Sequence, residues 1–441
     1  MAKFPRWSLM AVLLAVFLAP EAYANTYIAA SCNTSDVQAA LNLAADGDTV
    51  IIPNGSCTWT YGLTTSLQIT LTGESVGGVV ITDADTNSSD NLLTINIGSS
   101  FHTTIANLNF LPGTGTGTYI TVQGTGLVPL MHDMDFNIPN FQLQHAVDWH
   151  VTGGVIWNTT FESTYNLNGT CGQQVGSDSG SLSVKSNKNW DDASTMGTLD
   201  TNGDQNLYIE DSTFNYVGQA PDMDDNARVA IRHTTFINTS GALIHGPTST
   251  YGGRSVEFYN DTFTYSNTNR SLQRWYWGRG GTAVITNNSV DADTGGCYGP
   301  RASWVFIVES ATRSTSHGCC TSYACFHQPG SGSDGTSGHT FLSTSQTPYD
   351  SYQQSDPVYI WNNTGTGQGN LGLNDDTSMG CSSPGADTAA FFVQNRDYFL
   401  DTTSSPTSGA KPGWAPYPYP HPLHTGTPGP DSPAVPQGKA H

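Results

Sequence analysis

The chain has 441 residues and a formal net charge of −21, with 36 acidic and 15 basic residues. This charge argues against nucleic acid and anionic membranes as partners, because both are themselves negative. Turn-forming and β-compatible residues are abundant while helix-forming Lys and Glu are scarce, which favours an all-β structure.

Residues 1–24 have the features of a secretory signal peptide. Lys3 and Arg6 precede an apolar stretch at positions 9–19, and Ala22-Tyr23-Ala24 matches a cleavage site. The apolar stretch is too short to span a bilayer, and no later segment is longer. We therefore expect a secreted protein, extracellular or periplasmic, without a membrane span and monomeric.

Residues 25–66 are predicted to form an N-terminal cap and a first strand. Ser35 or Asp36 can cap a short helix whose apolar face carries Val37, Ala40, Leu41, Leu43 and Ala44. Gly47 ends this helix, and residues 49–52 are predicted to form a buried strand.

All eight cysteines follow the signal peptide. An even number in an exported chain indicates disulfides, with Cys32–Cys57 as the favoured pair and the other pairings open.

A six-residue phrase recurs seven times further along the chain. It ends at Phe110, Phe136, Phe161, Phe214, Phe236, Phe263 and Val290. The spacings are 26, 25, 53, 22, 27 and 27 residues, and 53 is close to two periods. A period in the twenties with a strand in each unit is typical of a solenoid.

Two positions of the phrase are nearly constant. Five residues before each ending stands a large apolar side chain: Ile105, Met131, Ile156, Ile209, Ile231, Phe258 or Ile285. Three residues before it stands Asn107, Asp133, Asn158, Asp211, His233, Asn260 or Asn287. The first position predicts an internal ladder. The second predicts a one-residue bend with positive φ, which makes His233 a corner residue rather than a site residue.

Residues 35–59, SDVQAALNLAADGDTVIIPNGSCTW, resemble the N-terminal cap of right-handed parallel β-helix proteins of the pectate-lyase-like superfamily. The following LQITLTGES is similar to the first coil of that superfamily. The ending KPGWAPYPYPHPL resembles that of a group of bacterial right-handed β-helix proteins. These resemblances imply an all-β, single-stranded right-handed parallel β-helix with an N-terminal capping helix.

The solenoid is expected over residues 67–400, with loop insertions at 164–204 and 297–345. A further strand pair is expected around 357–364 and 389–400. The Pro/Gly-rich tail, residues 401–441, is predicted to be extended, with 425–441 disordered.

Strand alternation predicts which side chains of the middle coils point outward. Glu210, Arg232 and Tyr259 form one transverse row, with Trp157 at the equivalent place in an earlier coil. Tyr208, Arg228 and Glu257 belong to neighbouring outward positions. The row has a plain structural alternative as a surface ion pair.

Three loops before these strands are expected at one edge of the same sheet, at residues 221–226, 244–254 and 269–281. They contribute His245, Arg254, Arg274, Trp275, Tyr276, Trp277 and Arg279. Aromatic faces suit sugar rings and Arg binds carboxylates, but the aromatics could also only shield a coil edge.

The first loop contains Asp222, Asp224 and Asp225. This cluster is interpreted as a solvated turn, a Ca²⁺ site or a pair of catalytic acids, and it has no EF-hand pattern. Ca²⁺ is the cofactor that it would imply.

The leading hypothesis is a polysaccharide lyase that cleaves an anionic, uronate-containing polysaccharide by β-elimination, as the resemblance to pectate lyases implies. Arg228, Arg232 and Arg254, or Ca²⁺ at the aspartates, would neutralise the uronate carboxylate. His245 is the preferred base, and Tyr208 or Tyr259 the acid. Glu210, Glu257, Trp157 and the arginines and aromatics of residues 274–279 would bind substrate. The chain has neither a WiDH-like segment nor an RxPxxR motif, so pectate itself is not implied.

Two alternatives stay open. Asn202-Gly-Asp204, Asp224-Asp225, His245-Gly246 and Arg254 follow the motif order of polygalacturonases, which are hydrolases, although the Arg-x-Lys motif is missing. A non-catalytic β-helix that only binds glycan is the third hypothesis, because one scaffold hosts all three functions.

Overall fold

The computed structural model describes residues 24–87, 91–115, 117–138, 145–163, 180–239, 242–244, 252–264, 274–291, 304–308, 327–333, 353–369, 371–374, 388–401 and 409–424. The predicted signal peptide up to residue 23, His245, residues 425–441 and every cysteine except Cys32 and Cys57 lie outside these ranges. None of the helices within them is long and apolar enough to cross a membrane.

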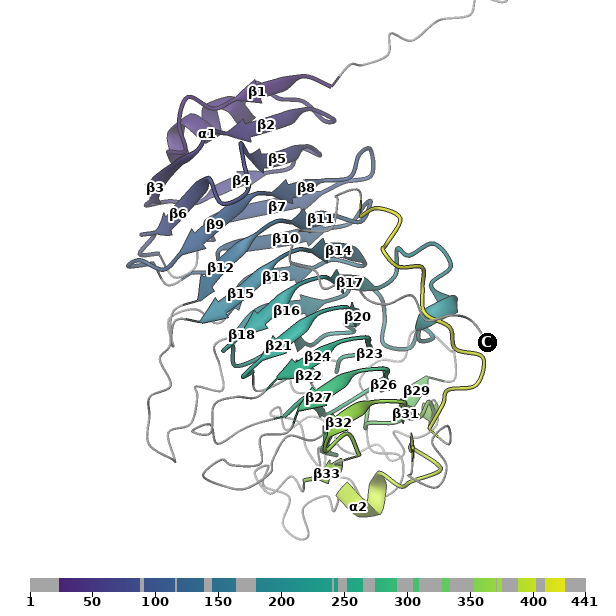
Figure 1. Ribbon diagram of the computed structural model, residues 1–441. Coiled ribbons are helices and arrows are strands. Elements are labelled where there is room, and N and C mark those ends of the chain that lie inside the picture. Colours follow the sequence, from purple (N-terminus) through teal and green to yellow (C-terminus); the bar gives the residue numbers. More distant parts are fainter. Residues whose placement is uncertain are drawn as a thin grey trace, which may run out of the picture.

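The protein is a single-stranded right-handed parallel β-helix, in which successive coils stack along one axis (Figure 1). Each coil contributes strands to three parallel sheets, here called sheets A, B and C. The predicted fold class is therefore confirmed.

Within the described residues sheet A has twelve strands, with a single-residue corner between it and sheet B in the middle coils. In spatial order its strands are β1 (Thr26–Ile28), β2 (Thr49–Ile52), β5 (Thr70–Gly73), β8 (Thr104–Ala106), β11 (Leu130–His132), β14 (Gly154–Trp157), β17 (Leu207–Glu210), β20 (Arg228–Arg232), β23 (Ser255–Tyr259), β26 (Thr282–Thr286), β31 (Val358–Trp361) and β34 (Tyr398–Leu400).

Sheet B follows sheet A in each coil. In the part of the chain that the structure describes, its ten strands are β3 (Gly55–Trp59), β6 (Val79–Asp83), β9 (Leu108–Leu111), β12 (Asp135–Ile138), β15 (Thr160–Ser163), β18 (Thr213–Asn215), β21 (Thr235–Ile237), β24 (Thr262–Thr264), β27 (Ser289–Asp291) and β32 (Thr364–Thr366).

Sheet C closes the coil. Its ten strands among the described residues are β4 (Leu63–Thr65), β7 (Leu93–Ile97), β10 (Ile120–Gly124), β13 (His145–His150), β16 (Gly180–Lys185), β19 (Asp222–Met223), β22 (Ala242–Ile244), β25 (Tyr276–Gly278), β28 (Trp304–Phe306) and β33 (Leu371–Leu373). The short strands β29 (Ser331–Ser333) and β30 (Gln353–Ser355) form a separate antiparallel pair.

The corner between sheets A and B occupies the predicted position of the phrase. Every predicted corner residue, from Asn107 to Asn287, has φ between 47° and 60°. Asn362 adds one more such corner after β31, with φ of 52°. Asn and Asp tolerate this conformation best among residues with a side chain, which explains their recurrence.

The core consists of ladders that run along the solenoid axis. The apolar position of the phrase is fully buried in each coil, and Met131, Ile156 and Ile209 pair in register across neighbouring strands. The phrase endings stack as aromatic rings, with 5.1 Å between the centroids of Phe136 and Phe161 and 4.5 Å between those of Phe236 and Phe263. Both ladders confirm the internal orientation of the phrase.

The 53-residue spacing is a single coil with a long insertion, not two coils. β14 pairs directly with β17 in sheet A, and β15 pairs directly with β18 in sheet B. The insertion itself provides β16 to sheet C, followed by a loop that contains the 3₁₀ helix η1 (Gly197–Leu199).

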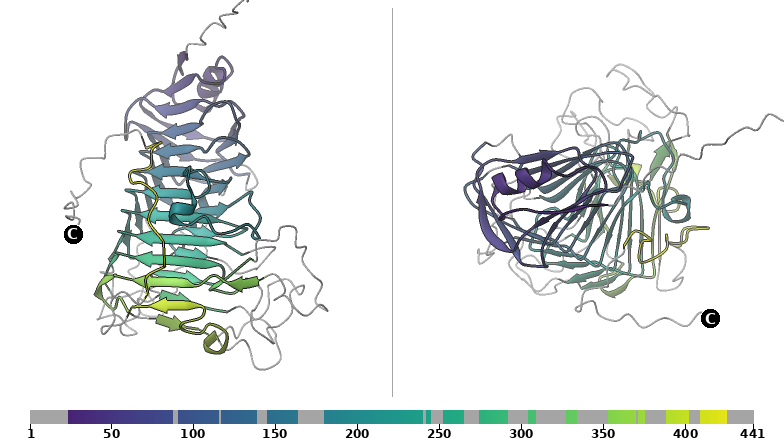
Figure 2. Two further views of the ribbon diagram at one scale, coloured as in Figure 1. Left: turned by 90° about the vertical axis from the view of Figure 1, so that its right-hand side faces the viewer. Right: turned by 90° about the horizontal axis from the view of Figure 1, so that it is seen from above.

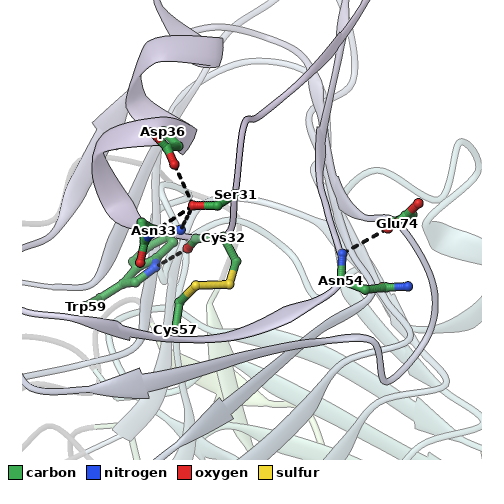
Figure 3. The surroundings of a disulfide bond; sticks show 8 residues. All are labelled: Ser31, Cys32, Asn33, Asp36, Asn54, Cys57, Trp59 and Glu74. Atoms are coloured by element: carbon green, nitrogen blue, oxygen red, sulfur yellow. Dashed lines mark hydrogen bonds between the residues drawn. A yellow bond between two sulfur atoms is a disulfide. The ribbon is translucent and has the colours of Figure 1, made fainter.

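The N-terminal cap contains helix α1 (Thr34–Leu41), which buries Val37, Ala40 and Leu41. Of the two predicted residues after the helix, Leu43 is 67% exposed and Ala44 packs against the core. The Cys32–Cys57 disulfide is confirmed, and Trp59 donates a hydrogen bond of 2.9 Å to the Cys32 carbonyl beside it (Figure 3).

At the other end of the solenoid, β31 and β34 pair as the predicted late strands. Residues 388–391 form helix α2 (Thr388–Phe391) instead of the start of a strand. Residues 409–424, hereafter the C-terminal strap, form no helix or strand and cross the strands of sheet A (Figure 2, left, yellow).

Candidate functional site

The predicted outward row exists in sheet A. Glu210 pairs in register with Arg232, and Arg232 with Tyr259. Trp157 occupies the same position one strand earlier, opposite Glu210. The orientation and alignment that the repeat predicted are therefore confirmed.

The row is nevertheless not exposed, because the C-terminal strap covers it. Arg232 donates hydrogen bonds to the carbonyl oxygens of Tyr417, at 2.5 Å, and Pro418, at 2.8 Å. Glu210 accepts the backbone N–H of His421 at 3.1 Å. Tyr259, Trp157, Glu210 and Arg232 are all at most 2% exposed. The expectation of a substrate-accessible row is wrong in this conformation.

The remaining predicted residues of sheet A are also buried. Tyr208 donates a 2.8 Å hydrogen bond to Asp200, and Trp414 donates one of 3.1 Å to Glu257. Burial raises the pKa of Tyr208, so its hydroxyl remains protonated. Neither Tyr208 nor Tyr259 is placed to meet a polymer as a catalytic acid.

Two predicted arginines are held by the loop after β16. Arg228 donates to the Asn189 and Asp192 carbonyl oxygens, each at 3.0 Å. Burial lowers the pKa of Arg228 to about 9. Arg254 forms a 3.0 Å ion pair with Asp356 and lies over the Trp190 ring. These contacts give both side chains a structural role, and they do not lie on an open surface.

The three predicted loops do lie side by side, but they belong to sheet C rather than to the edge of sheet A. The first and third loops contain β19 and β25, and the second begins at the last residue of β22; these three strands are neighbours in that sheet. Of the three aromatics, Trp275 and Tyr276 are buried in the core, and Trp277 is half-buried on the outer face. The guanidinium carbons of Arg274 and Arg279 lie 3.9 and 5.1 Å from the centroid of the Trp277 ring.

A second polar cluster lies on sheet C, hereafter the sheet C cluster, made of His145, Asp148, His150, Lys185, Asp222 and Asp225. Strand register places Asp148 of β13 opposite Ser183 of β16, and Ser183 opposite Asp222 of β19. His150 pairs in register with Lys185. Three successive coils therefore contribute to one strip of surface.

The contacts in the sheet C cluster join cationic and anionic groups. Opposite ring nitrogens of His145 contact Asp148 at 3.6 Å and Asp222 at 3.3 Å. Lys185 Nζ lies 3.1 Å from Asp225. The side chains of these five residues are between 13% and 36% exposed. Solvent therefore reaches the cluster, in contrast to the row on sheet A.

Two neighbouring groups of the cluster, Lys185 and His150, differ in protonation state. Burial lowers the pKa of Lys185, but the hydrogen bond and charge of Asp225 outweigh it and raise the pKa, so the ammonium stays charged. Burial lowers the pKa of His150, and the Lys185 charge adds to this effect. His150 is consequently neutral at neutral pH. Its Nε2 atom is buried and has no hydrogen-bond partner within the described part of the chain. A neutral imidazole beside an ammonium provides a base and an acid.

The predicted metal-binding loop forms one side of this cluster. Asp222 and Asp225 contact His145 and Lys185, respectively, while the Asp224 N–H donates to the Val184 carbonyl. Two of the three carboxylates thus already face cationic or imidazole groups. Among the described residues, the group with closely placed metal-ligand atoms is a different one, Glu210, Asp211 and His424.

Sequence reasoning missed His145, Asp148, His150 and Lys185. They lie on strands β13 and β16 of sheet C, which fall between occurrences of the recurring phrase, so the register of the phrase does not align them. The segment HAVDWH does have polar residues between buried apolar ones, and this signal could have identified β13. His245, the predicted base, lies outside the described residues, and Asn202 and Asp204 lie in the loop before β17 of sheet A.

The three stacked parallel sheets place this protein in the class of right-handed parallel β-helix proteins. No protein-family model and no curated protein matches the chain. The resemblance of the segment KPGWAPYPYPHPL to a group of bacterial right-handed β-helix proteins therefore stays a prediction.

Several solved structures are similar to this chain at low sequence identity. A PL6 family polysaccharide lyase from Pseudopedobacter saltans is 12% identical, with a TM-score of 0.44 over 90% of this chain and 88% of that one. An alginate lyase from a Paenibacillus species is 15% identical, with a TM-score of 0.34 over 65% and 82%. The ORF18 protein of Geobacillus virus E2 is 12% identical, with a TM-score of 0.39 over 63% of this chain and 53% of that one, about half of its length. Likeness at this level concerns the fold alone.

Proposed function

We propose that this protein is a secreted polysaccharide lyase that cleaves a uronate-containing polysaccharide by β-elimination on the outer face of sheet C. The observation that carries the proposal is the pairing of a neutral imidazole, His150, with a charged ammonium, Lys185, on a solvent-accessible strip. The strip runs along the solenoid axis, which suits an extended polymer.

The reaction requires three groups. A cation neutralises the uronate carboxylate, a base removes the proton on the adjacent carbon, and an acid protonates the leaving oxygen as its bond to carbon breaks. Lys185 can meet the first or third requirement, and His150 is the base through its Nδ1 atom, because its Nε2 atom is buried. The electron pair of the broken C–H bond forms the carbon–carbon double bond, and the glycosidic oxygen leaves with the donated proton.

Trp277, flanked by Arg274 and Arg279, provides a binding position on the same face. Asp222 pairs with Leu243, and Leu243 with Trp277, so this platform lies two strands, or about 10 Å, from Asp222 along the axis. An aromatic face with two guanidinium groups suits a sugar ring that carries a carboxylate. Ca²⁺ at Asp222, Asp224 and Asp225 remains part of the proposal as a second means of neutralising that carboxylate.

A hydrolase is the second candidate, favoured by one observation. Asp148 and Asp222 contact opposite nitrogens of the same imidazole, which allows their carboxyl groups to lie up to about 9 Å apart, within the range of inverting glycosidases. The Asp224-Asp225 pair of the polygalacturonase-like motif is in the same region, but Asn202 and Asp204 are on sheet A.

The test is incubation of the mature protein with pectate, alginate and glycosaminoglycans, with and without EDTA. Ultraviolet absorbance of an unsaturated product indicates a lyase, and new reducing ends without absorbance indicate a hydrolase. Binding without either product would instead support the non-catalytic glycan-binding alternative and overturn the lyase proposal.

Replacement of Lys185 tests the proposed site most directly. Lys185→Ala is expected to lower kcat by about 10²- to 10⁴-fold, because it removes the proposed acid and charge. Lys188→Ala, a few residues later in the turn after β16, is the matched control and should retain wild-type turnover. Turnover by Lys185→Ala within a few-fold of wild type, in a protein that unfolds at the wild-type temperature, would refute the assignment.

A further inference from the structure

A group of metal-ligand atoms lies where the C-terminal strap meets sheet A. Glu210 ends β17, Asp211 is the corner residue that follows it, and His424 belongs to the strap. His424 Nδ1 lies 3.0 Å from Glu210 Oε2 and 3.9 Å from Asp211 Oδ2. One ligand atom from each residue falls within 4.8 Å of the other two.

One of these atoms is left without a hydrogen bond. Asp211 Oδ2 is buried and accepts none from the residues that the structure describes, although the side chain is only 6% exposed. The other oxygen, Oδ1, accepts the Tyr419 hydroxyl. Burial raises the pKa of Asp211; the Tyr419 hydrogen bond opposes this, and the Glu210 charge adds to it. A buried carboxylate oxygen without a hydrogen bond, 3.9 Å from an imidazole nitrogen, is a position that suits a cation.

We propose that Glu210, Asp211 and His424 bind a divalent transition-metal ion, for which Zn²⁺ is the best fit, and that the ion fastens the C-terminal strap to sheet A. This site is separate from the sheet C cluster and does not depend on the proposed function.

The donor set and spacing both favour Zn²⁺. One imidazole and two carboxylates, with a solvent molecule as a fourth ligand, form a common zinc environment, whereas Ca²⁺ prefers six or more oxygens. Bonds of about 2.0–2.1 Å in a tetrahedral arrangement place ligand atoms about 3.3 Å apart. The observed separations of 3.0 and 3.9 Å lie on either side of that value, so small side-chain movements suffice.

The surrounding side chains orient the ligands. Arg232 Nε donates a 2.7 Å hydrogen bond to Glu210 Oε1, which leaves Oε2 directed at His424. The Trp157 ring stacks on the His424 ring at 4.7 Å. When ionised, the carboxylates of Glu210 and Asp211 and the guanidinium of Arg232 together have a net negative charge, which a divalent cation would offset. Such supporting contacts usually accompany a metal site.

The test uses the full mature chain, dialysed against a chelator and titrated with ZnCl₂ by calorimetry. Wild-type protein is expected to bind one equivalent at this site. Asp211→Asn should lose at least tenfold in affinity, and His424→Ala should give the same loss. Asp133→Asn is the matched control, because Asp133 is also a corner residue and Asn occupies that corner in neighbouring coils. It should bind Zn²⁺ as wild type does.

Limited proteolysis gives a second readout that does not require activity. Zn²⁺ should slow cleavage within residues 409–424 in the wild type and in Asp133→Asn, and should have no effect in Asp211→Asn. Absence of Zn²⁺ binding by wild type at millimolar ZnCl₂ would overturn the proposal. Equal affinity and equal protection in Asp211→Asn and Asp133→Asn would overturn it as well.

Discussion

Arg232 connects strands of sheet A to the C-terminal strap. It donates to Glu210, to the Tyr259 hydroxyl and to two carbonyl oxygens of the strap. Its side chain is fully buried, so each of these contacts replaces a hydrogen bond to water. A buried ion pair adds little net stability compared with an apolar pair, but loss of one partner leaves an uncompensated charge. Arg232 therefore fixes where the strap docks.

Glu257 lies close to this network and should make stability depend on pH. Burial raises the pKa of Glu257 from 4.5 to about 7, although the Trp414 hydrogen bond opposes this. A raised folded-state pKa means that the contribution to stability is complete below about pH 4.5 and is lost as pH rises through about 7. Glu257→Gln should therefore gain roughly 2–3 kcal/mol relative to wild type between pH 5 and pH 8. Urea denaturation at the two pH values measures the difference, and parallel pH profiles for both proteins would contradict it.

The C-terminal strap and the outer face of sheet A together form an apolar cluster. Tyr417 and Leu423 pack on Trp157 and Tyr208, apart from the main core inside the solenoid. In these coils sheet A is thus buried on both faces, by the core on the inside and by the strap on the outside.

A chain that ends at residue 408 should therefore lose about 3–6 kcal/mol of stability, from the exposure of two or more large apolar side chains. Differential scanning calorimetry of this variant and of a chain that ends at residue 424 separates the strap from the residues after it. The longer variant should unfold at the wild-type temperature. If both truncations unfold as wild type does, the strap does not stabilise the fold.

The recurring phrase was sufficient to predict the corner, the internal ladder of its apolar position and the row Glu210–Arg232–Tyr259. Each of these depends on local register within one strand pair. The phrase did not predict which partner covers that row, because the Pro-rich strap has no periodicity that would assign it to a face. It also did not predict the sheet C cluster. The strands of this cluster are as short as two residues, and stacking brings Asp222 into contact with His145 across 77 positions of sequence.

At the scale of the whole molecule, stability is distributed coil by coil. In solenoids each unit contacts only its neighbours, so local damage propagates weakly. The N-terminal end is closed by α1 and by the Cys32–Cys57 bond, which links the segment before α1 to β3.

Removal of that bond by Cys32→Ala/Cys57→Ala should cost about 3 kcal/mol, and the loss should be confined to the first coils. Hydrogen exchange followed by mass spectrometry should show faster exchange in β1, β2, β3 and β6, with β20 and β23 unchanged. A uniform increase along the whole solenoid would show instead that the protein unfolds as one unit.

The strap follows the described strands of sheet A in the sequence, which has a consequence for biogenesis. Synthesis proceeds from the N-terminus, so the cap and the middle coils exist before residues 409–424 do. During that interval Glu210 and Arg232 remain hydrated, and Trp157 and Tyr208 are exposed to other molecules. Residues 409–424 emerge after these coils and complete the burial. A chain interrupted before residue 409 would carry an exposed apolar and charged surface that quality-control proteases can recognise.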